Sequence, residues 1–397
     1  MKFFVPYAIS AIVWLIIGSI RLLEEVLFQK QKVLIKGDEL SDQLTTVAII
    51  IPAHNEKKVL DKTINSARRI VPRSQIYVVD DASTDTTFQI AKGQKVNVLR
   101  LKIPHGKARA LRRIIEHHSL LRKYKYILFL DADTILKKDY LKNALQLFHS
   151  SKDFAAIAGY VISSFRKHKG LSRRKFYEGY RFRQNKIYQM FITYGQTWKY
   201  TNVAQVLPGS CSIYKTKVLK KMVIDAPGLI IEDFNLAFQI QKNKLGLIGH
   251  HPSISSKDQD PDNLPDYWRQ VFRWNKGYFQ TVRLYGIWPS GFWLAQGFFL
   301  SEVFISSFFF LFLPVAQFPL YRAIGLAPLS LPDIVVLFIL IDYSFTALVA
   351  LVTKKYKLLI YGLGFFIFYP INSAILFLSL TGLFTRSDGL WSPPQRR

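Results

Sequence analysis

Cysteine is nearly absent from this sequence, which excludes the protein classes that depend on it. A single cysteine, Cys211, occurs among 397 residues, so there is no disulfide framework and no metal cluster held by several cysteines. Glycine (21) and proline (17) are not abundant either, whereas aromatic residues make up 15%. This composition excludes collagen-like repeats and intrinsic disorder. A reducing compartment is compatible with it.

Several common nucleotide and metal motifs are also missing. The sequence has no GxGxxG after its first strand-like run, no GxxxxGK[ST] and no HExxH. These motifs carry dinucleotide binding, phosphate-loop nucleotide binding and zinc-dependent proteolysis, respectively. A dinucleotide dehydrogenase, a P-loop NTPase and a zinc protease of that type are therefore not predicted.

Acidic residues are few for the number of basic ones. The 27 Asp and Glu oppose 54 Lys and Arg, which gives a net charge of +27, yet half of the residues are hydrophobic and the mean hydropathy is +0.12. A soluble basic protein is polar on average, so this combination indicates that apolar residues are concentrated in blocks.

Four apolar blocks are long enough to cross a bilayer core, which is about 30 Å thick. A cleaved signal peptide is the alternative for the first block, although no clear small-x-small cleavage site follows it. Cations follow the first block and separate the last two, which by the positive-inside rule places the section between them in the cytosol. The blocks are residues 3–20, 293–318, 331–352 and 358–381. We therefore expect a multi-pass protein of the cell membrane with a cytosolic central section.

Two features of these blocks need an explanation. Glu302 and Asp342 lie inside predicted spans, where a carboxylate facing lipid is costly, so both are expected to face protein or a polar cavity. The side of the C-terminus stays open, because four spans place it outside whereas Arg386 and the terminal arginines favour the cytosol. Pro370 could bend the last span or make it re-entrant.

The section between residues 45 and 290 has the pattern of an α/β domain. Short β-branched runs alternate with amphipathic stretches, and polar residues collect at the C-terminal ends of the runs. Continuous apolar runs are typical of buried parallel strands, and ligands bind at the carboxyl edge of such sheets. The predicted strands are residues 47–53, 76–81, 96–101, 126–133 and 154–160. Three polar clusters are thus expected to meet at one edge.

An acidic pair ends the fourth predicted strand. Asp131 and Asp133 are separated by one residue, and their carboxylates repel each other unless a cation lies between them. Mg²⁺ or Mn²⁺ accepts one or two carboxylates and leaves positions for phosphate oxygens. A solvated turn, or a helix cap that includes Thr134, is the alternative interpretation of this pair alone.

Six motifs in order give the domain a resemblance to a known family. They are PAHNE (52–56), VDDASTD (79–85), GKA (106–108), DAD (131–133), Glu232-Asp233 and QVFRW (270–274). In the identity and order of these six motifs, the chain resembles the inverting, membrane-bound family 2 glycosyltransferases, which include cellulose, chitin and hyaluronan synthases. One span before the domain and three after it resemble the layout of the bacterial chitooligosaccharide synthases.

The resemblance implies a GT-A fold, which is Rossmann-like, together with a set of functional residues. Asp233 would be the catalytic base. By the same resemblance, the nucleotide would be bound by Glu56, Asp81, Lys107 and Asp131, the metal ion by Asp131 and Asp133, and the diphosphate or acceptor by Gln270, Arg273 and Trp274. The cofactor would be Mg²⁺ or Mn²⁺. The partners would be a nucleotide-sugar donor, with a UDP-sugar favoured, a saccharide or lipid acceptor and the bilayer, without nucleic acid; the oligomeric state is left open.

The expected organisation follows from the spans and the motifs together. A transmembrane helix (1–22) precedes a cytosolic GT-A domain with interfacial helices (45–290), three transmembrane helices (291–384) and a C-terminal tail (385–397). The sequence departs from the family at Ile231, where many members have Thr, and at His54, where Tyr is common. It has no match to the FxVTxK gating loop of cellulose synthases. The small-residue loop 207–211 lies where the family places an acceptor loop.

Two other functions compete with an oligo- or polysaccharide synthase. A glycolipid-forming glycosyltransferase of the ceramide or polyprenol type would share most of these motifs. The segment 166–186 combines about ten cations with aromatic residues, so a non-enzymatic membrane protein that holds nucleic acid or a partner is the alternative from another class. Beside membrane spans, we favour the interpretation of this segment as a surface helix on anionic headgroups.

Overall fold

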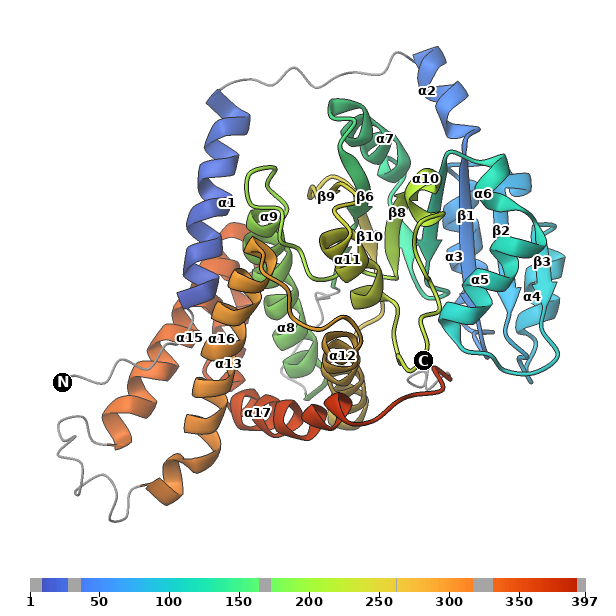
Figure 1. Ribbon diagram of the computed structural model, residues 1–397. Helices are drawn as coiled ribbons and strands as arrows, with labels where there is room; N and C mark the ends of the chain where they lie inside the picture. The colour runs from blue at the N-terminus through green and yellow to red at the C-terminus, as the bar shows by residue number, and fades with distance from the viewer. Residues whose placement is uncertain (1–8, 28–36, 164–172, 262, 317–330, 391–397) are drawn as a thin grey trace.

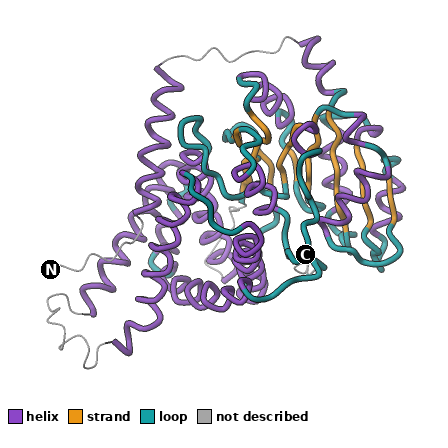
Figure 2. The backbone as a smooth tube through the Cα atoms, in the orientation of Figure 1, coloured by secondary structure: helices purple, strands orange, loops and turns teal. Residues whose placement is uncertain are grey.

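A computed structural model describes residues 9–27, 37–163, 173–261, 263–316 and 331–390. An α/β domain lies on one side of the molecule and a group of long helices on the other, as Figures 1 and 2 show. The chain passes from the first long helix into the α/β domain and then returns through the remaining helices.

The α/β domain is built on a seven-stranded sheet in the order β3-β2-β1-β4-β8-β6-β9. The four strands β3, β2, β1 and β4 are parallel, with Ile50 of β1 opposite Tyr77 of β2. The strands are β1 Val47–Ala53, β2 Ile76–Asp80, β3 Asn97–Arg100, β4 Tyr126–Leu130, β6 Phe154–Ala158, β8 Cys211–Lys215 and β9 Leu247–Gly249. The five strands expected from the sequence are all present.

The five predicted strands all run in the same direction, but a strand that was not predicted makes the sheet mixed. This strand, β8, runs antiparallel to both of its neighbours, β4 and β6. Its insertion separates β4 from β6 and brings the loop that precedes Cys211 to the carboxyl end of β4. This loop becomes part of the candidate site described below.

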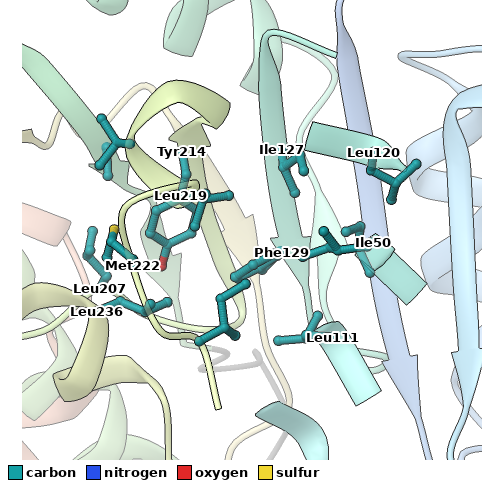
Figure 3. Close-up of a cluster of buried hydrophobic side chains, with 14 of the residues drawn as sticks. Ile50, Leu111, Leu120, Ile127, Phe129, Leu207, Tyr214, Leu219, Met222 and Leu236 are labelled. Atoms are coloured by element: carbon teal, nitrogen blue, oxygen red, sulfur yellow. The ribbon is translucent and has the colours of Figure 1, made fainter. Parts of the chain in front are cut away.

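Helices cover both faces of the sheet, which explains why β1 is apolar throughout and wholly buried. Side chains alternate between the faces, so that Ile49 and Ile51 enter one hydrophobic core and Ile50 enters the other. Figure 3 shows the second core, where Ile50, Ile127 and Phe129 of the sheet lie beside Leu111 and Leu236 of the covering helices.

The covering helices are arranged in two layers. Those contributing to the core around Ile49 are α3 Leu60–Arg68, α4 Thr87–Gly93 and α7 Tyr140–Ser150. Those contributing to the core around Ile50 are α5 Lys107–His117, α6 Leu120–Lys123, α10 Thr216–Leu219 and α11 Asp233–Lys242. The short elements α2 Gly37–Leu44 and η1 Arg73–Gln75 lie at the edge where β1 begins.

A small second sheet joins distant parts of the chain. It has three strands in the order β5-β10-β7, which are β5 Ile135–Leu136, β10 Ser255–Lys257 and β7 Tyr160–Ile162. Lys257 of β10 pairs with Ile135 of β5. Because β5 begins just after Asp133 and β10 ends just before Asp258, this pairing brings the two acidic segments together.

The long helices pack around the opposite side of the domain. They are α1 Ile9–Leu27, α8 Arg173–Lys186, which continues into the π-helix η2 Ile187–Thr193 and α9 Tyr194–Gln196, α12 Leu264–Tyr285, α13 Gly291–Ala316 and α15 Leu331–Thr353. The C-terminal part comprises α16 Lys357–Gly362, η3 Phe365–Ile367, α17 Phe368–Ser379 and η4 Leu380–Leu383. α1 lies so close to α9 that a side chain at Gly195 would collide with the backbone of Trp14.

The structure modifies the predicted spans. α1 extends past the predicted end at residue 22, and the last predicted span is divided into α16, η3 and α17. In Figure 1, α17 runs crosswise to α13 along the lower side of α12. Among the described residues, one helical segment, Phe365–Leu383, is long and apolar enough to cross a membrane.

Both carboxylates inside predicted spans face protein, as expected. Glu302 is 6% exposed and accepts a hydrogen bond from the backbone N–H of Ser10 at 2.7 Å, which ties α13 to α1. Asp342 is 3% exposed and forms an ion pair with Arg183 at 2.6 Å, while Thr346 accepts from the same guanidinium at 3.0 Å. These contacts join α13 to α1 and α15 to α8.

The predicted helix in segment 166–186 is present as α8, but the prediction that it lies on the surface is wrong for the described part, because α8 is largely buried. Tyr180 stacks on Phe368 with ring centroids 3.7 Å apart, and Phe176 stacks on the same ring at 5.6 Å. Arg183 is 1% exposed through its pair with Asp342, whereas Arg174 has an exposed side chain. Residues 166–172 lie outside the described residues. α8 is therefore a packing element between the domain and α15 to α17.

We predict that Asp342→Ala destabilises the protein by about 3–5 kcal/mol, because it leaves Arg183 buried without its carboxylate. The matched control is Glu116→Ala, which removes an exposed partner of Arg112 and is expected to change stability little. Thermal unfolding of the detergent-solubilised proteins measures both. Equal unfolding temperatures for the two variants would contradict the structural role of the Arg183–Asp342 pair.

Candidate active site

Polar residues that follow β1, β2 and β4 meet at one edge of the sheet, as the sequence predicts. The backbone N–H of Asp81 donates to the carbonyl of Ala53 at 2.9 Å, which joins the ends of β2 and β1. Thr63 donates to the carbonyl of Ala132 at 2.7 Å, which joins α3 to the turn after β4. The carboxyl ends of these parallel strands therefore lie side by side at one edge of the sheet.

Asp81 and Glu56 are buried at this edge. Asp81 is fully buried, and its two carboxylate oxygens accept from the backbone N–H groups of His105 and Gly106 at 2.8 and 2.7 Å. Glu56 is 1% exposed, and its backbone N–H donates to Thr87 at 2.8 Å. Asp81 thus fixes the loop that leads into α5 and, through it, the position of Lys107.

Lys107 is the centre of an ion-pair cluster. It is the first residue of α5, and its Nζ lies 2.7 Å from both Asp131 Oδ1 and Glu232 Oε1. Burial lowers the pKa of the ammonium group, but the negative charges of Asp131, Glu232 and Asp233 together raise it by more. The pKa of Lys107 therefore lies well above its ordinary value. The lysine is therefore a fixed positive charge beside the end of β4.

Gly209 lies in contact with the charged groups of this cluster. A β-carbon at Gly209 would be 2.5 Å from Asp233 Oδ1 and 2.6 Å from Glu232 Oε1, and it would also contact Lys107 Nζ. The loop approaches so closely because Asp131 N–H donates to the carbonyl of Ser210 at 3.3 Å. Only the lack of a side chain at Gly209 allows the carboxylates and the ammonium group to converge.

Asp233 begins α11 and combines burial with nearby charge. Burial, followed by the negative charge of Glu232, raises its pKa to about 7, while Lys107 and the backbone N–H of Gly209 act in the opposite direction. A carboxyl group with a pKa near neutrality can accept a proton and release it again. The position is therefore suited to acid–base chemistry.

Two further carboxylates, which were not among the predicted site residues, lie beside the acidic pair. Asp258 accepts from the hydroxyl of Thr134 at 2.6 Å, and burial followed by the charge of Asp133 raises its pKa to about 8. Asp260 follows two residues later. The Asp258-Gln259-Asp260 pattern repeats the spacing of Asp131 and Asp133, and that repeat was the available signal in the sequence.

The donor set at this edge fits a hard divalent cation. Asp131 and Asp133 supply carboxylate oxygens, and burial, followed by the repulsion from surrounding carboxylates, raises the pKa of Asp258. Within the described ranges, no three acidic, imidazole or thiol side chains converge as a complete metal cage. Mg²⁺ and Mn²⁺ do not require one, since phosphate and water oxygens complete their coordination.

The other predicted residues lie on a separate element. Gln270, Arg273 and Trp274 are on α12, one turn or less apart. α12 approaches the ion-pair cluster of Lys107 at Gly277, because a side chain there would collide with Ile231, which directly precedes Glu232. α12 also contacts α8, where the guanidinium of Arg181 lies over the Trp274 ring at 5.4 Å.

The mixed sheet, its acidic carboxyl edge and the lysine between Asp131 and Glu232 form a site that can bind an anionic ligand at that edge. Comparison with known proteins gives a family for this part of the chain. Residues 48–223 match the model of Glycosyl transferase family 2. This part of the chain is a family 2 glycosyltransferase domain, and the protein is a glycosyltransferase.

Curated relatives with detectable similarity include polysaccharide synthases. The chain is 23% identical over 297 residues to poly-beta-1,6-N-acetyl-D-glucosamine synthase of Staphylococcus epidermidis, a match covering 73% of this chain and 68% of the relative. It is 41% identical over 70 residues to Protein RfbJ of Shigella flexneri, which covers 17% of this chain and about half (52%) of that protein.

A solved structure supports the fold. The mannosyltransferase PcManGT from Pyrobaculum calidifontis, in complex with GDP-Man and Mn²⁺, superposes with a TM-score of 0.52 at 16% identity. The superposition covers 93% of this chain and 99% of the other. At this level of identity the likeness extends to the GT-A fold, which the family resemblance implies, and not to the substrate.

Proposed function

We propose that this protein is a membrane-embedded, inverting and metal-dependent glycosyltransferase that adds sugar from a nucleoside-diphosphate sugar to a growing oligo- or polysaccharide. The observation that carries the proposal is the cluster of Lys107, Asp131, Glu232 and Asp233 around Gly209. It combines a fixed cation with a titratable carboxylate at the edge of the sheet where α/β proteins bind ligands.

The donor would lie across the ends of β1, β2 and β4. Glu56 and Asp81 would contact the nucleotide, and Lys107 would oppose the charge of the diphosphate. Asp131 and Asp133 would hold a divalent cation, which supplies charge stabilisation for the departing diphosphate when it is bound. Arg273 would add a planar donor group for phosphate oxygens.

The acceptor would approach from the side of α12. Asp233 would take the proton from the attacking hydroxyl group, and Trp274 would offer an aromatic face to the acceptor ring. A single base that acts without a covalent intermediate transfers the sugar with inversion at the anomeric carbon. The pKa of Asp233 near 7 supports this role, because the carboxyl group can then both accept and release a proton at neutral pH.

Membrane embedding is supported by the apolar helices. We assign α1, α13, α15 and the segment Phe365–Leu383 to the membrane and the GT-A domain to the cytosol. The similarity to a polysaccharide synthase over 73% of the chain favours a saccharide acceptor. The burial of α8 in the helix packing disfavours the alternative in which the whole basic segment holds nucleic acid.

Labelled UDP- and GDP-sugars, supplied to membranes that contain the protein, test the function. We expect one donor to give products of many lengths, with loss of turnover on chelation of divalent cations and in Asp133→Asn. The control is Asp153→Asn, an exposed acid remote from this cluster. A single chloroform-soluble product would instead identify a glycolipid-forming enzyme, and no sugar transfer from any donor would contradict the proposal.

The pH dependence of transfer is a second prediction. Because only the carboxylate form of Asp233 can accept a proton, we expect kcat/KM to rise with pH through about 7 and then level off. Initial rates with limiting donor, measured across this range, give the apparent pKa. A profile that is flat through neutrality would show that Asp233 does not titrate during the rate-determining step.

A further inference from the structure

Two lysine side chains from distant parts of the chain meet at the ring of Phe182. Lys186 Nζ lies 5.6 Å from the centroid of this ring, and Lys355 Nζ lies 5.4 Å from it. Lys186 is the last residue of α8, whereas Lys355 lies in the turn between α15 and α16. Both residues are partly buried. The folded chain therefore holds two ammonium groups close to one aromatic ring.

Lys186 is held in position by the α/β domain. Its Nζ donates to the hydroxyl oxygen of Tyr160 in β7 at 2.7 Å and lies 4.8 Å from the centroid of that ring. Burial, followed by the positive charge of Lys355, lowers the pKa of Lys186 to about 8. The two like charges repel each other, and an anion bound by both would relieve the repulsion. The pair therefore has the charge and the proximity that an anion requires.

The turn that carries Lys355 has the composition of a membrane boundary. Lys354, Tyr356 and Lys357 are exposed around it, and residues 343–387 contain no Asp or Glu. Tyrosine is enriched at the headgroup level of a bilayer, and an anionic leaflet attracts juxtamembrane cations. Because α15 is assigned to the membrane, we place the turn at its end at the level of the lipid headgroups.

Exposed apolar side chains border this turn on both sides. Leu351 and Val352 precede it at the end of α15, and Ile360 and Leu363 follow it in and directly after α16. All four are more than half exposed. Acyl chains can cover such side chains at the boundary between headgroups and hydrocarbon, whereas a free phosphate ion cannot. The surroundings therefore favour a phospholipid over a soluble phosphate.

Helix α8 connects the turn to the α/β domain. Phe182 packs with Val349 of α15 and Leu358 of α16, while Lys186 of the same helix bonds to β7. In Figure 1, α8 lies between the strands and these two helices. An anion bound by Lys186 and Lys355 would thus join the domain side of α8 to the membrane helices.

We propose that Lys186 and Lys355 bind the headgroup phosphate of an anionic phospholipid of the cytosolic leaflet. The exposed apolar residues of α15 and α16 contact its acyl chains, and the bound lipid fixes α8 against both helices. Lys354 and Lys357 add attraction at longer range. This inference rests on the membrane embedding in the proposed function, and it uses none of the residues assigned to the donor.

Native mass spectrometry of the full-length, detergent-solubilised protein tests the site. The probes are phosphatidylglycerol and phosphatidylcholine with the same acyl chains, which differ in net charge. We expect the wild-type protein to bind phosphatidylglycerol about tenfold more tightly than phosphatidylcholine, or better. The double variant Lys186→Gln/Lys355→Gln is expected to lose this preference, because it removes both cations that contact the phosphate.

Two control variants remove the same amount of charge elsewhere. Lys220→Gln/Lys221→Gln changes exposed residues that follow α10 in the α/β domain, and it should retain the full preference. Lys354→Gln/Lys357→Gln changes exposed lysines of the same turn, and it should weaken phosphatidylglycerol binding less than the loss of the proposed pair does. The second control separates a defined site from general attraction to a basic turn.

Thermal unfolding identifies a double variant that fails to fold. Lys355→Gln alone then replaces it, with a loss of phosphatidylglycerol affinity of about threefold or more. Equal binding of both lipids by the wild-type protein, an equal loss in either control, or displacement of phosphatidylglycerol by excess inorganic phosphate would overturn the lipid site. Wild-type protein that alkaline carbonate releases from membranes would overturn the membrane embedding of the proposed function instead.

Discussion

Replacing Asp233 by Asn is expected to lower kcat by about 10²–10⁴-fold, the range that a positioned general base contributes. The amide is nearly the same size as the carboxylate, but it cannot accept the proton of the attacking hydroxyl group. The Kd of the nucleoside diphosphate should change little, because Lys107 retains its pairs with Asp131 and Glu232. Single-turnover rates at saturating donor and acceptor, with separate nucleotide titrations, measure the two quantities.

Two controls show whether the loss belongs to proton transfer. Asp153→Asn makes the same chemical change at an exposed position and should leave kcat at the wild-type value. Any residual activity of Asp233→Asn should also lose its dependence on pH near 7, since the titrating group has been removed. If the variant keeps full turnover, Asp233 has no part in the mechanism, and Glu232 becomes the remaining carboxylate of the motif.

The parts of the site predicted from sequence are those at the ends of buried parallel strands. β1, β2 and β4 are covered on both faces, so their apolar runs are continuous and their ends are clear in the sequence. Asp81 and Asp131 follow those ends directly. Their convergence required only the rule that parallel strands present their carboxyl ends at one edge.

Residues that depend on long-range pairing could not be predicted in the same way. β10 is three residues long and reads Ser-Ser-Lys, which has no strand pattern, and it is held in place by β5 and β7. The position of Asp260 therefore became apparent only in the folded chain. The antiparallel strand β8 is likewise positioned by its pairing with β4 and β6, which lie far from it in the sequence.

The basic segment illustrates how charge pattern alone can mislead. The 14 residues of α8 carry six cations, so their composition indicates an exposed helix. In the folded protein Arg183 is paired with Asp342, 159 residues away, and Arg181 lies beside Asp260. A sequence shows the cations but not these distant partners, so the burial of the helix was not predictable from composition.

The second large effect is expected from Gly209→Ala, a change of one methyl group. The new β-carbon would meet the carboxylates of Asp233 and Glu232 and the Lys107 ammonium group, so these side chains have to shift, and a shift of Lys107 or Glu232 disturbs their ion pair. No left-handed backbone conformation is needed at this position, so the backbone itself accepts alanine. We expect kcat/KM to fall about 10²-fold or more, the cost of displacing catalytic groups by about 1 Å.

Gly93→Ala is the matched control, because a β-carbon there has no neighbour within 4 Å. The two variants share the same chemical change and the same loss of freedom in the unfolded chain, so their difference isolates the crowding at the cluster. kcat/KM and the unfolding temperature, measured for both, separate a displaced site from a misfolded domain. Activity of Gly209→Ala equal to that of Gly93→Ala would show that the carboxylates can spread without harm, and that their convergence around Gly209 is not what makes the site active.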